Sequence, residues 1–265
     1  MSVVYKLAYI LIFLFADKSL SAQAYDSNLT SKDDRISDSL YLDSLYNLSY
    51  DLSFYDLDSA LLVTEEFLSF SRKKNDLNIE LGMTNKGYLN TQIGNQKTAL
   101  DCFFYVLKLG EDKGDSTLVS QAYNDIAMAY MEFREYEKAL YYNENSLQIS
   151  RSQNDLKSIS LTLNNYGLVF LYLENYEKAS EVFNEALMLK ENFFEEETDP
   201  DEKYYLEIDI AMLESNLGLV YKYQNQFQNA IDITKKAELI FKKLGLDFYL
   251  IQSYTTLSEL CFIQN

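Results

Sequence analysis

Apolar side chains recur along this chain with the period of an α-helix. Tyr123, Ile126 and Tyr130 stand at positions i, i+3 and i+7, which places them in one stripe on a helix. The same stripe returns 40 residues later as Leu163, Tyr166 and Phe170. Leu217 and Tyr221 continue it nearer the carboxyl end. The pattern predicts amphipathic helices that each bury one face.

A short word of sequence returns at the same distance. EYEKAL at residues 135–140 and NYEKAS at residues 175–180 are nearly identical. The alanine of this word has equivalents along the chain, namely Ala60, Ala99, Ala139, Ala179 and Ala230. A second small residue precedes most of them by 12 positions, namely Gly87, Ala127, Gly167 and Gly218. Periods of 20 to 50 residues indicate stacked helical repeats.

Each period is predicted to form two helices that pack against one another. The first helix carries the apolar stripe and the small residue, and the second begins near the tyrosine of YEKA. The small residue allows the second helix to approach closely, because a larger side chain there would overpack the contact at a cost of about 1–3 kcal/mol. The word YEKA therefore recurs because each copy starts an equivalent second helix.

These motifs resemble those of the tetratricopeptide repeat family. The family pattern, an Asn-Leu-Gly-x-x-Tyr-like first helix followed by a Tyr-x-x-Ala second helix, stands here as NYGLVF (165–170) with YEKA, and as NLGLVY (216–221) with FQNA (227–230). The resemblance covers roughly residues 36–263. It implies an all-α fold, a right-handed α-solenoid of antiparallel helix pairs, with five units and one terminal helix.

The chain also departs from the family pattern. Its units are about 40 residues long instead of 34, and the family's tryptophan and its proline between units are missing. The unit around Ala60 has Leu48 where the small residue belongs, and the unit around Ala99 has Lys86 and Asn90 on its core stripe. An insertion of 11 residues precedes the last full unit and contains EEETDPDE (195–202), which we interpret as a solvated acidic loop that could also touch a basic partner.

The expected organisation is a signal peptide, a short lead-in and the repeat array. Residues 1–24 combine Lys6, an apolar run over residues 7–16 and a small-x-small site that ends at Ala24, which is the order of a secretory signal peptide. The lead-in spans 25–35 and the array spans 36–265. Its predicted units are 36–75, 76–115, 116–155, 156–194, 203–246 and a partial unit at 247–265. We expect cleavage after Ala24 and a periplasmic or extracellular location.

Charge and missing residue types narrow the function. The net charge is −18, which disfavours binding to nucleic acid and to anionic lipid. The chain has no histidine, so histidine-based catalysis and histidine metal ligands are excluded. Cys102 and Cys261 are expected to be buried thiols too far apart for a disulfide or a shared metal. No phosphate-binding glycine motif is present. We expect no enzyme activity, no cofactor, no metal and no membrane insertion after cleavage.

A second stripe on the first helices predicts a binding groove, because first helices line the concave face of stacked pairs. The position two before the small residue holds an amide or a carboxylate in four units, at Asn85, Asp125, Asn165 and Asn216. The rest of the stripe is apolar and aromatic: Leu81, Leu161, Met212, Tyr88, Met128, Leu168, Leu219, Tyr172 and Tyr223. In peptide-binding members of the family, asparagines at this place hold the backbone of the ligand. An alternative is that asparagine is simply a habitual polar residue there.

The hypothesis is a non-catalytic scaffold that binds a protein or an extended peptide, apolar with some positive charge, on this face. The alternative is the extracytoplasmic sensor portion of a longer bacterial signal-transduction protein, of the histidine kinase or helix-turn-helix regulator type. That alternative rests on the resemblance and on the array stopping after the first helix of a sixth unit. A third alternative is a structural adaptor.

Overall fold

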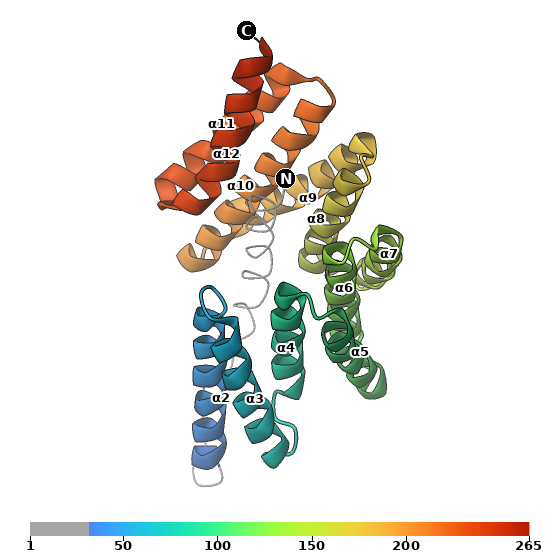
Figure 1. The fold of residues 1–265 in the computed structure, drawn as a ribbon, viewed down its shortest axis with the longest axis vertical. Helices are drawn as coiled ribbons and strands as arrows, with labels where there is room; N and C mark the ends of the chain where they lie inside the picture. The colour runs from blue at the N-terminus through green and yellow to red at the C-terminus, as the bar shows by residue number, and fades with distance from the viewer. Residues whose placement is uncertain (1–31, 265) are drawn as a thin grey trace. The chain divides into compact units, whose positions relative to one another are not determined.

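The computed structural model describes residues 32–264, and over this range the chain forms helices and no strand (Figure 1). The helices are α2 (Lys32–Leu52), α3 (Leu57–Lys73), α4 (Ile79–Ile93), α5 (Gln96–Lys113), α6 (Ser116–Glu132), α7 (Tyr136–Ser152), α8 (Leu156–Tyr172), α9 (Tyr176–Glu196), α10 (Pro200–Tyr223), α11 (Phe227–Leu244) and α12 (Asp247–Gln264). The fold is all-α. The predicted signal peptide and most of the predicted lead-in lie outside the described residues.

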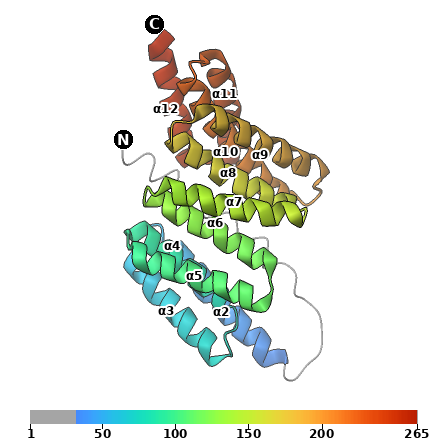
Figure 2. The ribbon, with the colours of Figure 1, turned by 90° about the vertical axis from the view of Figure 1, so that its right-hand side faces the viewer.

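The helices fall into two compact units that divide between residues 135 and 136. The N-terminal unit contains α2 to α6, and the C-terminal unit contains α7 to α12. Within each unit every helix packs on the next one in sequence, as α8 with α9 and α10 with α11 show in Figure 2. Connections between successive helices are short, so neighbours run antiparallel.

Helix starts are set by side chains that accept hydrogen bonds from the first turn. The Asp155 carboxylate accepts one from the Ser158 amide at 3.1 Å, and the Asn175 side chain accepts one from the Lys178 amide at 3.2 Å. Such caps satisfy amide groups that have no partner inside the helix. The residue that precedes each cap, Asn154 or Glu174, takes a positive φ angle of 53° or 58°. The connection thus reverses the chain within three residues.

The small residues of the repeat lie where a second helix crosses a first helix. A methyl group on Gly87 would come within 2.5 Å of the Phe103 ring, and one on Gly167 within 2.6 Å of the Phe183 ring. At Gly218 the nearest atom would be the Thr234 hydroxyl oxygen, at 2.1 Å. The other small residues of the repeat are fully buried, namely Ala99, Ala127, Ala139, Ala179 and Ala230. Each crossing is therefore close because one partner lacks a side chain or has only a methyl group.

The acidic insertion is mostly helical instead of forming a loop. Helix α9 continues to Glu196 and α10 begins at Pro200, so only residues 197–199 lie outside a helix. Asp199 accepts hydrogen bonds from the amides of Asp201 (2.8 Å) and Glu202 (3.4 Å). Proline suits the first position of a helix because its missing N–H would have had no partner there. The extra residues therefore lengthen the two helices of one connection.

The two cysteines differ in burial, which corrects one expectation. Cys102 is buried on α5, as expected, but Cys261 is exposed on α12. Neither forms a disulfide. In the part of the chain from residue 32 to residue 264, we find no helix that combines the length and apolar character needed to cross a membrane.

Candidate functional site

The predicted groove residues of the N-terminal unit lie on α4 and α6. The Asn85 amide donates hydrogen bonds to the hydroxyls of Ser49 (2.9 Å) and Thr64 (3.0 Å), which themselves lie 2.7 Å apart. Asn85 is therefore held by the two helices that precede it, α2 and α3. Leu81, on the same stripe one turn earlier, is half-buried and packs on the apolar core of these helices.

Tyr88 and Asp125 join α4 and α6, two of the first helices of the N-terminal unit. The Tyr88 hydroxyl donates a hydrogen bond of 2.5 Å to the Asp125 carboxylate. Asp125 and Met128 are both buried on α6. Adjacent first helices thus meet through the stripe itself. The Asp125 carboxylate that was expected to face a ligand lies in this contact.

The equivalent residues of the C-terminal unit lie on α8 and α10, and their amides are buried. Asn165 is 0% exposed, and Asn216 is also buried. The Asn216 amide donates a hydrogen bond of 3.4 Å to the side-chain oxygen of Asn164. Asn164 is only half-buried and was not part of the predicted row. The sequence signal for it was present, since NN at 164–165 offers two adjacent amides.

Two predicted aromatic residues stack against the tyrosines of the repeated word. The Tyr172 ring lies 5.7 Å from the Tyr136 ring with an interplanar angle of 8°. The Tyr223 ring lies 5.1 Å from the Tyr176 ring at 15°. In both cases the second helix of one pair begins against the end of the next first helix. This pairing was not foreseen, although the spacing of tyrosines contains it.

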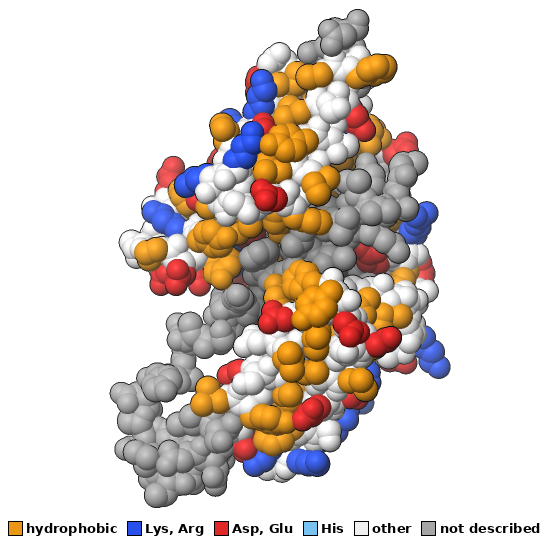
Figure 3. Space-filling model, turned by 60° about the vertical axis from the view of Figure 1, so that its left-hand side comes forward, with side chains coloured by type: hydrophobic (Ala, Val, Ile, Leu, Met, Phe, Trp, Pro, Cys, Tyr) orange, Lys and Arg blue, Asp and Glu red, His pale blue; other side chains and the backbone are white. Residues whose placement is uncertain are grey.

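The accessible part of the predicted stripe is therefore its apolar and aromatic edge. In the C-terminal unit Leu161, Met212 and Tyr172 are half-buried and Tyr223 is 41% exposed, whereas Leu168 and Leu219 are buried. Direct contact between the buried amides and a ligand stays a prediction. Groups of hydrophobic side chains interspersed with acidic ones are visible on the face drawn in Figure 3.

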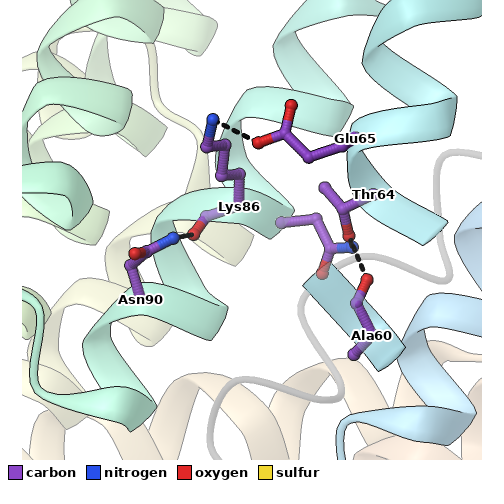
Figure 4. Close-up of polar contacts among 6 residues, drawn as sticks. Ala60, Thr64, Glu65, Lys86 and Asn90 are labelled. Atoms are coloured by element: carbon purple, nitrogen blue, oxygen red, sulfur yellow. Dashed lines mark hydrogen bonds and ion pairs between the residues drawn. The ribbon is translucent and has the colours of Figure 1, made fainter. Parts of the chain in front are cut away.

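A separate recess lies in the N-terminal unit between α3 and α5, with α4 at its floor. Its volume is about 450 Å³. The residues that line it are Asp58, Leu61, Leu62, Glu65, Lys86, Asn90, Asn95 and Thr98. Figure 4 shows Lys86 and Glu65 pointing toward one another, and the Lys86 ammonium lies 2.5 Å from the Glu65 carboxylate. The Asn90 amide donates to the Lys86 backbone carbonyl at 2.8 Å.

Lys86 and Asn90 stand out in the sequence as polar residues on the core stripe, but the recess itself was not predicted. In other units, large apolar side chains stand at the two equivalent positions. At the recess the place of Phe170 or Tyr130 is taken by the smaller Asn90. Burial raises the pKa of the nearby Cys102 thiol to about 11. The charge of Lys86 lowers this pKa, and the charge of Glu65 raises it.

A second open recess, of about 650 Å³, lies where α12 meets the end of α10 and the start of α11. Tyr223, Phe227 and Phe262 line it together with the ion pair of Lys222 and Glu259, whose charged atoms are 2.5 Å apart. Within residues 32–264 no cluster of acidic or cysteine side chains has an arrangement that could hold a metal ion.

Comparisons with known proteins place this geometry among helical-repeat proteins. The tetratricopeptide repeat family model matches residues 118–192, which cover α6 to most of α9. None of the curated proteins is similar in sequence to this chain.

Solved structures share the fold at low sequence identity. BtubC from P. vanneervenii is 19% identical, with 82% of this chain and 93% of that chain covered and a TM-score of 0.58. The tetratricopeptide repeat protein TTC0263 from Thermus thermophilus is 17% identical, with 82% and 98% covered and a TM-score of 0.56. The quorum sensor NprR from B. thuringiensis, in its apo form, is 19% identical, with 98% and 70% covered and a TM-score of 0.57. Residues 118–192 thus match the tetratricopeptide repeat family, and the described part of the chain has an all-α fold similar to that of these helical-repeat structures.

Proposed function

We propose that this chain is a non-catalytic scaffold that binds a protein or an extended peptide along α8 and α10, first helices of its C-terminal unit. The observation that carries the proposal is the contact between α8 and α10, across which Leu161, Met212, Tyr172 and Tyr223 form the accessible edge of one stripe. The edge offers apolar and aromatic surface for the side chains of a ligand, and the half-buried Asn164 supplies an amide donor and acceptor for its backbone.

The ligand should be apolar with some positive charge. The surface of the chain is strongly acidic, with 41 Asp and Glu residues against 23 Lys and Arg. Such a surface attracts cationic partners and repels anionic ones. The side chains of Asn165 and Asn216 are both buried. In this proposal they fix the orientation of the residues on the stripe.

Peptide selection followed by a matched pair of variants tests the proposal. Peptides selected from a random display library on the full chain would be measured by fluorescence anisotropy against wild type, Met212→Glu and Met188→Glu. Met212 is half-buried on the stripe of α10, whereas Met188 is 55% exposed on α9 and serves as the control. We expect Met212→Glu to weaken binding at least about tenfold, because it places a charge in the apolar contact, and Met188→Glu to leave it unchanged.

Two results would contradict this assignment. One is a selection that yields no binding peptide. The other is binding that Met188→Glu weakens as strongly as Met212→Glu, with both variants melting as wild type does. Either would show that the ligand does not sit on this stripe.

We further propose that the protein acts outside the cytoplasm, after removal of residues 1–24. The support is the order of charged, apolar and small residues at the amino end. Expression of the full chain in a bacterium, followed by amino-terminal sequencing of the product, should give a mature chain that starts at Tyr25. Recovery from the cytosol with residues 1–24 intact would refute the export proposal without affecting the binding proposal.

The second candidate function is the sensor portion of a signalling protein. Its support is the fold shared with the quorum sensor NprR over 98% of this chain, a likeness that concerns fold alone. A sensor changes conformation when its ligand binds, whereas a scaffold does not need to. Small-angle scattering with and without a selected peptide separates the two, because only the sensor should show a changed radius of gyration.

A further inference from the structure

The recess between α3 and α5 exists because two positions of the repeat carry unusual residues. Residues 40 apart are equivalent, so Lys86 corresponds to Ile126 and Tyr166, and Asn90 corresponds to Tyr130 and Phe170. In the C-terminal unit the equivalent place on α8 is filled by two rings, those of Tyr166 and Phe170, with centroids 4.6 Å apart. Beside α4 this volume is open.

Charge at the recess is negative and is only partly neutralised. Lys86 is 24% exposed and pairs with Glu65, whose side chain remains 49% exposed. Asp58 also lines the recess, so its three ionised residues sum to one net negative charge. An anion would meet two carboxylates here, which disfavours it. A cation is favoured instead, and the acidic surface of the whole chain acts in the same direction.

The recess has apolar walls and a charged rim. Leu61 and Leu62 line it, and Leu62 is 72% exposed. Asn90 is buried at its floor, and Asn95 and Thr98 add polar atoms on the α5 side. A ligand group that fits has a long apolar stem to cover leucine and a cationic end to meet carboxylate. Arginine has this form, and its planar guanidinium can also bind a carboxylate through two hydrogen bonds.

We propose that this recess binds an arginine side chain presented by a protein partner. The stem lies against Leu62, and the guanidinium meets the Glu65 and Asp58 carboxylates. The site is distinct from the proposed peptide stripe. Lys86 and Asn90 point from α4 at roughly 150° from the direction of Leu81, Asn85 and Tyr88, as 100° per residue requires. A single partially buried ion pair contributes little to stability, so the pair fits a role in recognition better than a role in holding the fold.

Titration with small peptides tests the proposal by NMR. The probe is acetyl-Ala-Arg-Ala-amide added to the ¹⁵N-labelled full chain. The comparison peptides carry lysine or citrulline in place of arginine, and citrulline keeps the shape of arginine without its charge. We expect saturable shifts confined to amides of residues 58–65 and 86–98 with the arginine peptide. We expect weaker shifts with lysine and none with citrulline.

Variants then locate the site. Glu65→Gln should weaken binding about tenfold, because a charge-assisted hydrogen bond is lost. Glu144→Gln is the matched control, since Glu144 occupies the equivalent place on α7 beside the filled position. The double variant Lys86→Tyr with Asn90→Phe copies the residues of α8 and should abolish binding by filling the recess. If the double variant does not fold, Glu65→Gln with Asp58→Asn decides the question, and loss of binding in it supports the site.

The proposal is overturned by any of three results. The first is that the arginine peptide causes no saturable shift at concentrations up to about 20 mM, where binding with a dissociation constant well above 1 mM would still be detected. The second is that the citrulline peptide binds as tightly as the arginine peptide. The third is that the folded double variant still binds the arginine peptide. None of these results bears on the peptide stripe, because Met212→Glu changes a different unit of the chain.

Discussion

The carboxyl group of Glu214 lies inside the C-terminal unit, and its burial raises its pKa to about 7. Lys236 on α11 partly offsets this, whereas Glu191 on α9 adds to it. One carboxylate oxygen has no hydrogen-bond partner among the residues that the structure describes. The folded chain therefore favours the protonated form of this side chain.

Glu214→Gln should stabilise the protein at neutral and higher pH. Because the folded pKa is above the ordinary value of 4.5, the folded state loses stability as the pH rises from about 4.5 through about 7. Glutamine has no charge to bury, so we expect a gain on the order of 2 kcal/mol at pH 8 and almost none at pH 4.5. Thermal unfolding across this range measures it, with Glu181→Gln on the surface of α9 as control. Equal pH dependence in wild type and Glu214→Gln would refute the prediction.

Gly167→Ala should destabilise the chain although alanine favours helices. The added methyl would stand 2.6 Å from the buried ring of Phe183, and relief of this overlap costs about 1–3 kcal/mol. Denaturant unfolding of Gly167→Ala, Phe183→Leu and the double variant forms a mutant cycle. We expect a coupling of at least about 1 kcal/mol, because the smaller leucine makes room for the methyl. A Gly167→Ala protein as stable as wild type would show that the crossing is looser than described.

At the scale of elements, the start of α10 is set by Asp199. Its carboxylate accepts hydrogen bonds from two amides of the first turn, and an N-cap of this kind contributes about 0.5–2 kcal/mol. Asp199→Ala should therefore lower the unfolding free energy by that amount and speed hydrogen exchange at the amides of residues 201 and 202. Asp201→Ala is the control, since Asp201 is exposed and its side chain does not cap the helix. Equal effects of the two substitutions would remove the special role of Asp199.

Helix type and helix order could be predicted from the sequence, whereas one connection could not. The stripe at Tyr123, Ile126 and Tyr130 specifies a helix because its period is 3.6 residues, and that helix is α6. The stretch EEETDPDE was interpreted as a loop from its charge. It extends α9 and begins α10 because glutamate is a good helix former and because proline suits the first position of a helix.

At the scale of the whole molecule, the net charge of −18 opposes folding through self-repulsion. Salt screens this repulsion, with a Debye length that falls to about 10 Å at 0.1 M. We expect the Tm to rise by about 2–4 °C between about 10 mM and 200 mM NaCl, the shift that 1 kcal/mol gives a domain of this size. A variant with Glu195, Glu196, Asp201 and Glu202 changed to their amides should respond less. A Tm that falls with salt would show that ion pairs outweigh repulsion.

Some features of the candidate sites follow from the sequence pattern, and others depend on how the helices pack. The stripe from Leu161 to Tyr172 follows from helical spacing alone. Its exposure does not, because the neighbouring helix determines whether Asn165 or Asn164 reaches the surface. The only sign of the recess in the sequence was the pair of polar residues, Lys86 and Asn90, on a predicted core stripe that is apolar in other units.

The amino-acid sequence by itself determined that the chain is a series of helix pairs, because hydrophobic period, capping residues and small residues at crossings act within or between adjacent helices. Tertiary structure alone decided which groups remain available. Tyr172 and Tyr223 stack on tyrosines of the preceding pair, Asp125 accepts a bond from Tyr88, and the absence of a ring at Asn90 leaves an open volume. These outcomes depend on distances between side chains of different helices, and a pattern read along one helix contains no information about them.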